Sequence, residues 1–245
     1  MRNILATGVS NGVGLAFSSA MLNRYPDLII YGISKCRSGE LNDLMERFPG
    51  RMLWHSLDLG KPFDLAANGL NDFLPPHIAL DAFLDNAGIY RPHLLTQLNE
   101  ERIMETMNVN LFSPMMLTKF AVKNFLRHKT PGSIVHVSSI AAHIGFNATS
   151  VYSAAKGGIE AFSRNVALEW GSRKIRSNVI TLGLLDIGMS RQVPEKLQQE
   201  LKERALLKTS TDTDTILHTI DFLLSGRSAS ITGENIQINA GVYMS

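Results

Sequence analysis

The segment TGVSNGVG, at residues 7–14, follows a short apolar run and contains three glycines, Gly8, Gly12 and Gly14. Glycine is entropically costly in regular structure, so three glycines directly after a strand need a structural reason. They suit either a tight turn or a backbone that a ligand approaches closely. Where a strand, a glycine turn and a helix start meet, backbone N–H groups and the helix dipole face an anion. The segment therefore predicts a phosphate-binding turn, with a plain βα turn as the alternative.

Short apolar runs typical of strands alternate along the chain with longer segments in which apolar residues return every three or four positions. This alternation predicts right-handed βαβ units, and therefore an α/β fold with a doubly wound parallel sheet. In such a sheet ligands bind beyond the carboxyl ends of the strands. No linker, repeat or charge block divides the chain, so we expect one domain over residues 1–245. The expected strands are Asn3–Ala6, Leu28–Ile33, Met52–His55, Leu80–Leu84, Ser133–Val137, Ser177–Thr181 and Asn235–Ile238.

Composition excludes several other classes of protein. The 24 basic and 22 acidic residues leave a net charge of +2, which gives no electrostatic case for binding nucleic acid. Cys36 is the single cysteine, so no internal disulfide framework is possible. No apolar stretch approaches the roughly 20 residues that cross a bilayer. We expect a cytoplasmic protein with no metal site, no nucleic-acid partner and no membrane partner.

Three further motifs follow the glycine turn in order. DNAG at residues 85–88 follows the fourth expected strand, NVN ends at Asn110, and SSIAAHIGFNATSVYSAAK contains Ser139, Tyr152 and Lys156. Tyr152 and Lys156 are four residues apart and so share one face of a helix. With TGxxxGxG at the start, this series resembles the classical short-chain dehydrogenase/reductase family from Met1 to the ITGENIQINAG segment. The resemblance implies a Rossmann-like sheet of about seven strands in the order 3-2-1-4-5-6-7. It also implies a dinucleotide site mainly in residues 1–110, and a catalytic and substrate part mainly in residues 110–245.

The resemblance implies a catalytic set of Asn110, Ser139, Tyr152 and Lys156. Tyr152 is expected to be the general acid and base, and Ser139 to hold the substrate oxygen, with Ser138 as its competitor. An ammonium near a phenol favours the phenolate, so we expect Lys156 to lower the pKa of Tyr152 and to bind the nicotinamide ribose. Asn110 is expected to fix a water that links Lys156 to solvent.

The choice of dinucleotide depends on the end of the second strand. NAD-binding relatives place an acid there, whereas this chain reads SKCRSGE with no acid before Glu40. Lys35 and Arg37 are cations suited to a 2′-phosphate, so NADP(H) is favoured over NAD(H), although position 11 is Asn where many NADP-using relatives carry a basic residue. Asp58 resembles the aspartate that binds the adenine amino group. The expected cofactor-binding residues are Thr7, Gly8, Ser10, Asn11, Gly12, Val13, Gly14, Ser34, Lys35, Arg37, Asp58, Leu59, Asn86, Ala87, Gly88, Tyr152, Lys156, Gly183 and Ile187.

The chain departs from the family after the sixth expected strand. Relatives carry a threonine there that holds the nicotinamide carboxamide, but this chain has Ile187, which has no hydrogen-bonding side chain. Ser190 or the backbone is the expected substitute. The segment from residue 185 to about residue 208 is expected to cover the substrate. Besides Ser139, the expected substrate contacts are Leu184, Leu185 and Met189.

The resemblance is closest to 3-oxoacyl-[acyl-carrier-protein] reductases. We therefore expect an NAD(P)-dependent oxidoreductase that acts on a small-molecule substrate or on an acyl thioester carried on acyl carrier protein. The first alternative is a relative that acts on a sugar, polyol, steroid or other small alcohol. The second is a dinucleotide-binding sensor without turnover.

A homotetramer or homodimer is expected from apolar residues on the two helices around Asn110 and Tyr152. These are Met115, Met116, Phe120, Phe125, Ile159, Phe162, Val166 and Trp170.

Overall fold

A parallel sheet forms the centre of the protein, for which a computed structural model describes residues 2–63, 68–188 and 193–244. The strand order is β3-β2-β1-β4-β5-β6-β7, and every neighbouring pair is parallel. The predicted fold and strand order are confirmed. The strands are β1 (Asn3–Thr7), β2 (Ile29–Ser34), β3 (Met52–Ser56), β4 (Ala82–Asp85), β5 (Gly132–Ser139), β6 (Ile175–Leu182) and β7 (Asn235–Ile238).

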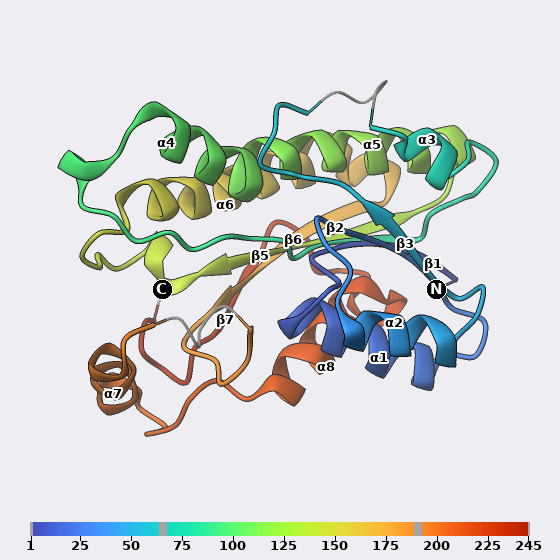
Figure 1. The fold of residues 1–245 in the computed structure, drawn as a ribbon. Coiled ribbons are helices and arrows are strands. Elements are labelled where there is room, and N and C mark those ends of the chain that lie inside the picture. Colours follow the sequence, from blue (N-terminus) through green and yellow to red (C-terminus); the bar gives the residue numbers. More distant parts are fainter. Residues whose placement is uncertain (1, 64–67, 189–192, 245) are drawn as a thin grey trace.

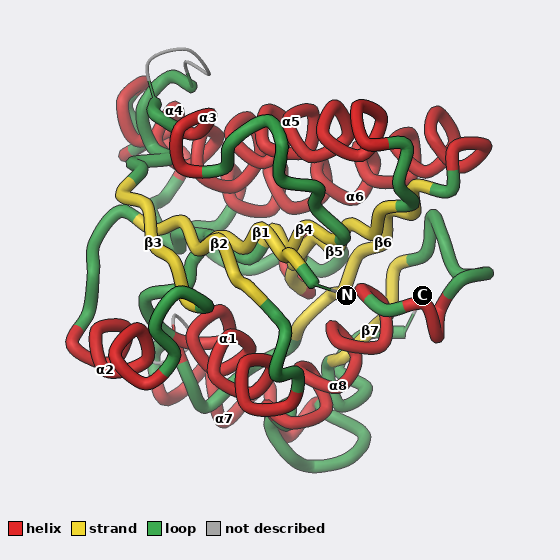
Figure 2. The backbone as a smooth tube through the Cα atoms, turned by 90° about the vertical axis from the view of Figure 1, so that its right-hand side faces the viewer, coloured by secondary structure: helices red, strands yellow, loops and turns green. Residues whose placement is uncertain are grey.

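Helices cover both faces of the sheet, as Figures 1 and 2 show. Helices α3, α4, α5 and α6 lie on one face, and α1, α2 and α8 lie on the other. Helix α7 lies on the second side, near the end of the sheet that holds the C-terminus (Figure 1). The helices are α1 (Gly12–Arg24), α2 (Gly39–Arg47), α3 (Leu70–Phe73), α4 (Glu100–Met107), α5 (Ser113–His128), α6 (Ser150–Trp170), α7 (Glu195–Arg204) and α8 (Thr213–Leu224).

Two apolar cores, one on each face, account for the burial of the central strands. On β1, the side chains of Ile4 and Ala6 join the core under α1 and α8, whereas Leu5 joins the core under α5 and α6. All three are fully buried. A parallel strand covered on both faces reads as a continuous apolar run because neither face meets water. This explains why the apolar runs in the sequence marked the strands well.

The long helix expected around Asn110 is interrupted by a wider turn. Residues Asn108–Phe112 form a π-helical turn between α4 and α5, rather than part of one regular helix. Such turns inside helices are frequent at functional sites. Asn110 lies in this turn and is 1% exposed, so it is not a surface position.

The apolar surface expected on α5 and α6 is smaller than the sequence suggested. Phe125, Ile159 and Val166 are buried within the chain itself, so they are not available to a second copy. The prediction was wrong for these residues because they pack against the sheet or the π-helical turn. Phe112 and Leu168 are instead exposed, the latter by 83%. Within the described ranges, no helix has the length and apolar character needed to cross a membrane.

The glycine turn packs against the end of β4 with no space for side chains. A Cβ atom on Gly14 would lie 2.3 Å from the Gly8 carbonyl oxygen, and one on Gly8 would lie 2.7 Å from the Asn86 amide nitrogen. Gly8 also has a φ of +71°, in the left-handed region that favours glycine. These two glycines are required by packing, whatever ligand the turn binds.

We predict that Gly14→Ala destabilises the protein by about 1–3 kcal/mol, because the added methyl group meets backbone that cannot move freely. The matched control is Gly39→Ala, at the start of α2, where a Cβ meets nothing within 4 Å. Thermal unfolding of the two variants and the wild type measures the difference. Equal melting temperatures for both variants would contradict the packing argument.

Candidate active site

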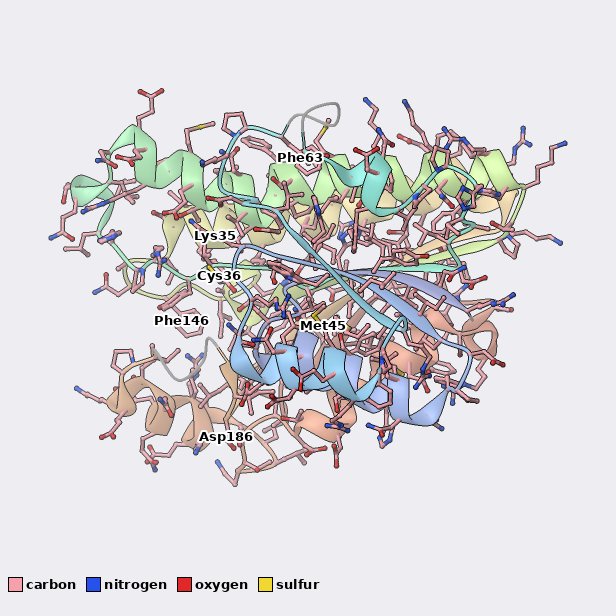
Figure 3. All side chains as sticks on the ribbon, turned by 45° about the vertical axis from the view of Figure 1, so that its right-hand side comes forward. Lys35, Cys36, Met45, Phe63, Phe146 and Asp186 are labelled. Carbon is pink, nitrogen blue, oxygen red and sulfur yellow. The ribbon has the colours of Figure 1, made fainter. Side chains whose placement is uncertain are left out.

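A cavity of about 360 Å³ opens at the carboxyl ends of the strands. It runs from the end of β2 at Lys35 past the glycine turn to Tyr152 on α6. Figure 3 shows Lys35 and Phe146, both of which line the cavity, on the same side of the ribbon. This is where ligands bind in doubly wound sheets.

Most of the residues expected at the site line this cavity. They are Gly8, Ser10, Asn11, Gly12, Val13, Ser34, Lys35, Asp58, Leu59, Asn86, Ala87, Gly88, Ser139, Tyr152, Lys156, Gly183, Leu184, Leu185 and Ile187. Thr7, Gly14, Arg37 and Asn110 are not in the lining. Met189, expected as a substrate contact, and Ser190, expected as a substitute for the missing threonine, lie outside the described residues.

Thr7 and Asn86 join β1 to the segment after β4. The Thr7 hydroxyl accepts hydrogen bonds from the Asn86 and Ala87 backbone N–H groups at 3.0 and 2.9 Å. The Asn86 side-chain amide donates to the Thr7 carbonyl at 3.0 Å. Thr7 is fully buried, so its side chain supports the cavity floor and does not reach into the cavity.

At the β2 end of the cavity, Lys35 and Asp58 form an ion pair with Nζ and Oδ2 3.0 Å apart. The hydrogen bond to Asp58 raises the pKa of Lys35. Burial favours a higher pKa for Asp58, but the bonds from Lys35 and from the Gly60 amide prevail and lower it. Both groups are therefore charged at neutral pH, and the Lys35 side chain remains 65% exposed.

Arg37 does not line the cavity. Its Nε donates to the Asn42 side chain, and its guanidinium carbon lies 5.7 Å from the centre of the Trp54 ring. The expectation that Lys35 and Arg37 act together at one ligand is not supported by this geometry, because Lys35 alone lines the cavity.

Ser139, Tyr152 and Lys156 converge at the other end of the cavity. Burial raises the pKa of Tyr152 to about 12, against the effect of a hydrogen bond from Ser139 and with a smaller contribution from Tyr90. Lys156 is 5% exposed, and its Nζ donates to the Val137 carbonyl at 2.8 Å. Desolvation thus dominates the pKa of Tyr152, and the expected lowering by Lys156 is not among the effects on it.

Asn110 approaches this centre from the π-helical turn. Its Nδ2 donates to the Ile89 and Thr106 carbonyls at 3.1 and 2.9 Å, and its Oδ1 accepts from the Ile89 N–H at 3.2 Å. These bonds fix the segment that carries Tyr90. The Tyr90 ring packs edge-on against the Tyr152 ring, with the ring centres 5.4 Å apart.

Several apolar residues that the sequence analysis did not single out also line the cavity near Ser139. They come from the segment after β5, from the segment before α7 and from α7 itself. They are Ile140, Ala141, Phe146, Val193, Leu197 and Leu201. Their position after β5 is a usable signal for the first three. The last three belong to the segment from residue 185 to about residue 208 that was expected to cover the substrate, and they line the cavity. Ile187 lines the cavity as well, as an apolar group.

The chain is similar over nearly its whole length to known reductases. A family model described as enoyl-(acyl carrier protein) reductase matches residues 8–243. The chain is 28% identical to the 3-oxoacyl-[acyl-carrier-protein] reductase FabG of Chlamydia pneumoniae, over 98% of this chain and 96% of that protein. It is also 28% identical to carbonyl reductase [NADPH] 2 of Sus scrofa, over 98% and 96%, and 26% identical to L-xylulose reductase of Caenorhabditis elegans, over 98% and 95%.

A solved structure of similar fold is 4-hydroxyisoleucine dehydrogenase in complex with NADH and succinate. Its TM-score is 0.88, its sequence identity is 22%, and the match covers 98% of each chain.

Within residues 2–63, 68–188 and 193–244, no group of three or more histidine, cysteine or acidic side chains is arranged to hold a metal ion.

Proposed function

The chain belongs to the short-chain dehydrogenase/reductase family of oxidoreductases, and from that premise we propose that it transfers a hydride between NADP(H) and the 3-oxo group of an acyl thioester. The observation that carries the proposal is the convergence of Ser139, Tyr152 and Lys156 in the cavity that the glycine turn borders. The acyl chain is proposed to arrive on acyl carrier protein.

The residues around the cavity fit a nicotinamide dinucleotide. Gly8 and Gly12 have left-handed φ values of +71° and +55°, and both border the cavity at the start of α1, where N–H groups can bind a pyrophosphate. The Lys35 ammonium can bind a 2′-phosphate. Its ion pair with Asp58 balances the negative charge of that carboxylate, which would otherwise repel the phosphate. Lys156, Gly183 and Ile187 also line the cavity. In the proposal, Lys156 would hold the nicotinamide ribose, and the segment at Gly183 and Ile187 would hold the nicotinamide ring.

In the proposed reaction the side chains hold the substrate oxygen and move one proton. The bound nicotinamide supplies the hydride for reduction of the carbonyl carbon. The Ser139 hydroxyl donates a hydrogen bond to the substrate oxygen, and the Tyr152 hydroxyl donates its proton to that oxygen as negative charge develops. A Tyr152 pKa of about 12 keeps the phenol protonated before reduction. Lys156, if charged, stabilises the phenolate that remains.

Proton return to Tyr152 is proposed to involve a water held by Asn110. The Asn110 Oδ1 accepts one hydrogen bond, from the Ile89 N–H. An amide oxygen has a second lone pair, which can accept a hydrogen bond from a water. The Asn110 side chain therefore holds the Tyr90 segment in place and retains one site for the relay.

The apolar wall of the cavity favours an acyl chain as substrate. Leu184, Leu197 and Leu201 belong to one apolar cluster with Ile140 and Phe146 beside the substrate end. A polyol would leave its hydroxyl groups without partners against this wall, which is costly. Reduction of another hydrophobic carbonyl compound is the second candidate, and the similarity to carbonyl reductase [NADPH] 2 favours it.

The proposal includes an assembly of two or four copies of a one-domain chain in the cytoplasm. Leu168 is 83% exposed on α6, and Met104 and Phe112 are 42% and 40% exposed at α4 and the π-helical turn. Exposed apolar side chains on neighbouring elements favour a covering partner.

We predict that Tyr152→Phe lowers kcat for carbonyl reduction by roughly 10²–10⁴-fold, because the ring remains but the transferable proton is lost. Tyr90→Phe is the matched control, since it removes a hydroxyl from the same cavity and keeps the ring contact with Tyr152. Initial rates with NADPH and a 3-oxoacyl thioester measure both. Retention of more than about a tenth of kcat in Tyr152→Phe would reject the acid role.

We predict that Lys35→Ala weakens NADPH binding far more than NADH binding. A charge-assisted hydrogen bond is worth roughly 1.5–3 kcal/mol, so the ratio of the two dissociation constants should change by about tenfold or more. Arg37→Ala is the control, because it removes a neighbouring cation that does not line the cavity. Fluorescence titration of the two cofactors gives the ratio. Equal losses in Lys35→Ala, or a wild type that prefers NADH, would exclude the proposed NADP selectivity.

A further inference from the structure

Behind the catalytic centre lies a carboxylate that the proposed reaction does not use. Glu160 follows Lys156 by one turn of α6 and is 5% exposed. Its Oε1 accepts a hydrogen bond from the Ser138 hydroxyl at 2.6 Å, and the His143 Nε2 lies 3.1 Å away. The Thr181 Oγ1 lies 3.2 Å from the same Oε1 but only 2.7 Å from the Asn235 Oδ1, and its single proton serves one of the two. The carboxylate thus links α6 to the end of β5. A buried acid is rare unless it is bound in this way.

Ser138 links Glu160 to the two elements that carry the proposed chemistry. The Ser138 hydroxyl, which donates to Glu160, is 3.4 Å from the Lys156 carbonyl oxygen. Ser138 directly precedes Ser139 at the end of β5. Glu160 therefore touches the strand that presents Ser139 and belongs to the helix that presents Lys156.

Lys156 needs nearby negative charge if it is to act as an ammonium. Its only hydrogen-bond acceptor among the described residues is the Val137 carbonyl, and it is almost fully buried. Burial lowers the pKa of Lys156, whereas the charges of Asp85 and Glu160 oppose that loss. Without them the amine would tend towards its neutral form, which does not stabilise a phenolate.

The other titratable groups around Lys156 come from β4, β5 and α6. Asp85, at the end of β4, has its Oδ2 2.9 Å from the His136 Nδ1 on β5, and its Oδ1 accepts a long bond from Thr7. On α6, the Tyr152 ring centre lies 5.9 Å from the Lys156 Nζ. Each carboxylate has a histidine nitrogen close by. Glu160 differs from Asp85 because it shares a helix with the lysine, and because the Ser138 hydroxyl binds it at 2.6 Å without adding charge.

We propose that Glu160 is a positioning residue whose buried carboxylate keeps Lys156 in its ammonium form. It acts through Lys156 and touches neither substrate nor cofactor. Ser138 and His143 hold the carboxylate in place. This role rests on the proposed function, since it matters only where Lys156 must carry charge.

The test is the titration of Lys156 in the cofactor-free protein, followed by NMR of selectively labelled lysine side chains. Lys156→Arg identifies the resonance. In Glu160→Gln, which keeps the size of the side chain and removes the charge, the Lys156 titration should move to lower pH. Glu169→Gln, an exposed position on the same helix, should leave it unchanged. An unchanged Lys156 titration in Glu160→Gln would overturn the proposal.

Kinetics provide a second readout. In NADPH-dependent reduction, the loss of activity at alkaline pH should begin at lower pH in Glu160→Gln than in the wild type. A uniform fall in kcat at every pH, with the midpoint unmoved, would mark a purely structural role and would overturn the proposal. If the amide prevents folding, Glu160→Ser leaves room for a water beside the Ser138 and Thr181 hydroxyls and should shift the titration in the same direction.

The two readouts separate this inference from the proposed function. If the wild type reduces no carbonyl compound but the Lys156 titration shifts in Glu160→Gln, the function is wrong and the charge interaction stands. If the wild type is active and the titration does not shift, the function stands and the role of Glu160 is wrong.

Discussion

The close contact between the glycine turn and the end of β4 is the constraint on which the site depends. Gly14 and Gly8 approach each other and Asn86 so closely that no Cβ atom fits. This contact brings the first βα turn beside the segment after β4, and Thr7 and Asn86 fix it with hydrogen bonds. The turn, the Asn86 segment and the ends of β5 and β6 then border one cavity. Contacts within the chain itself therefore set the backbone around that cavity.

Several polar side chains are buried at the same edge of the sheet. Asn110, Lys156 and Glu160 are each at most 5% exposed, and each is held by hydrogen bonds with neighbouring elements. Buried polar groups of this kind are costly unless they are paired, and they keep a site in one arrangement when they are. The same burial raises the pKa of Tyr152 and lowers that of Lys156, so the chemistry depends on the charges around the lysine.

Much of the fold could be predicted from the sequence. Buried parallel strands appear in it as apolar runs, and the close packing of the first turn requires glycines at fixed positions that the sequence shows directly. Which side chains contact one another in the candidate site could be predicted only in part. The ion pair of Lys35 with Asp58 joins the ends of β2 and β3, which are distant in sequence, and Arg37 turns to Trp54 for reasons of local packing. The π-helical turn at Asn110 leaves no mark in the apolar periodicity. Glu160 has no motif at all, and only the strands that approach α6 reveal its contacts.

The proposed function makes one central claim, that this chain uses NADPH to reduce a 3-oxoacyl thioester. The most direct measurement follows the near-ultraviolet absorbance of NADPH and of NADH with purified protein and a panel of a 3-oxoacyl thioester, a ketose and a simple ketone. We expect rapid loss of NADPH absorbance with the thioester, slower loss with the ketone and the ketose, and weak use of NADH. Cofactor binding without consumption on any of these compounds would contradict the claim and favour a dinucleotide-binding sensor.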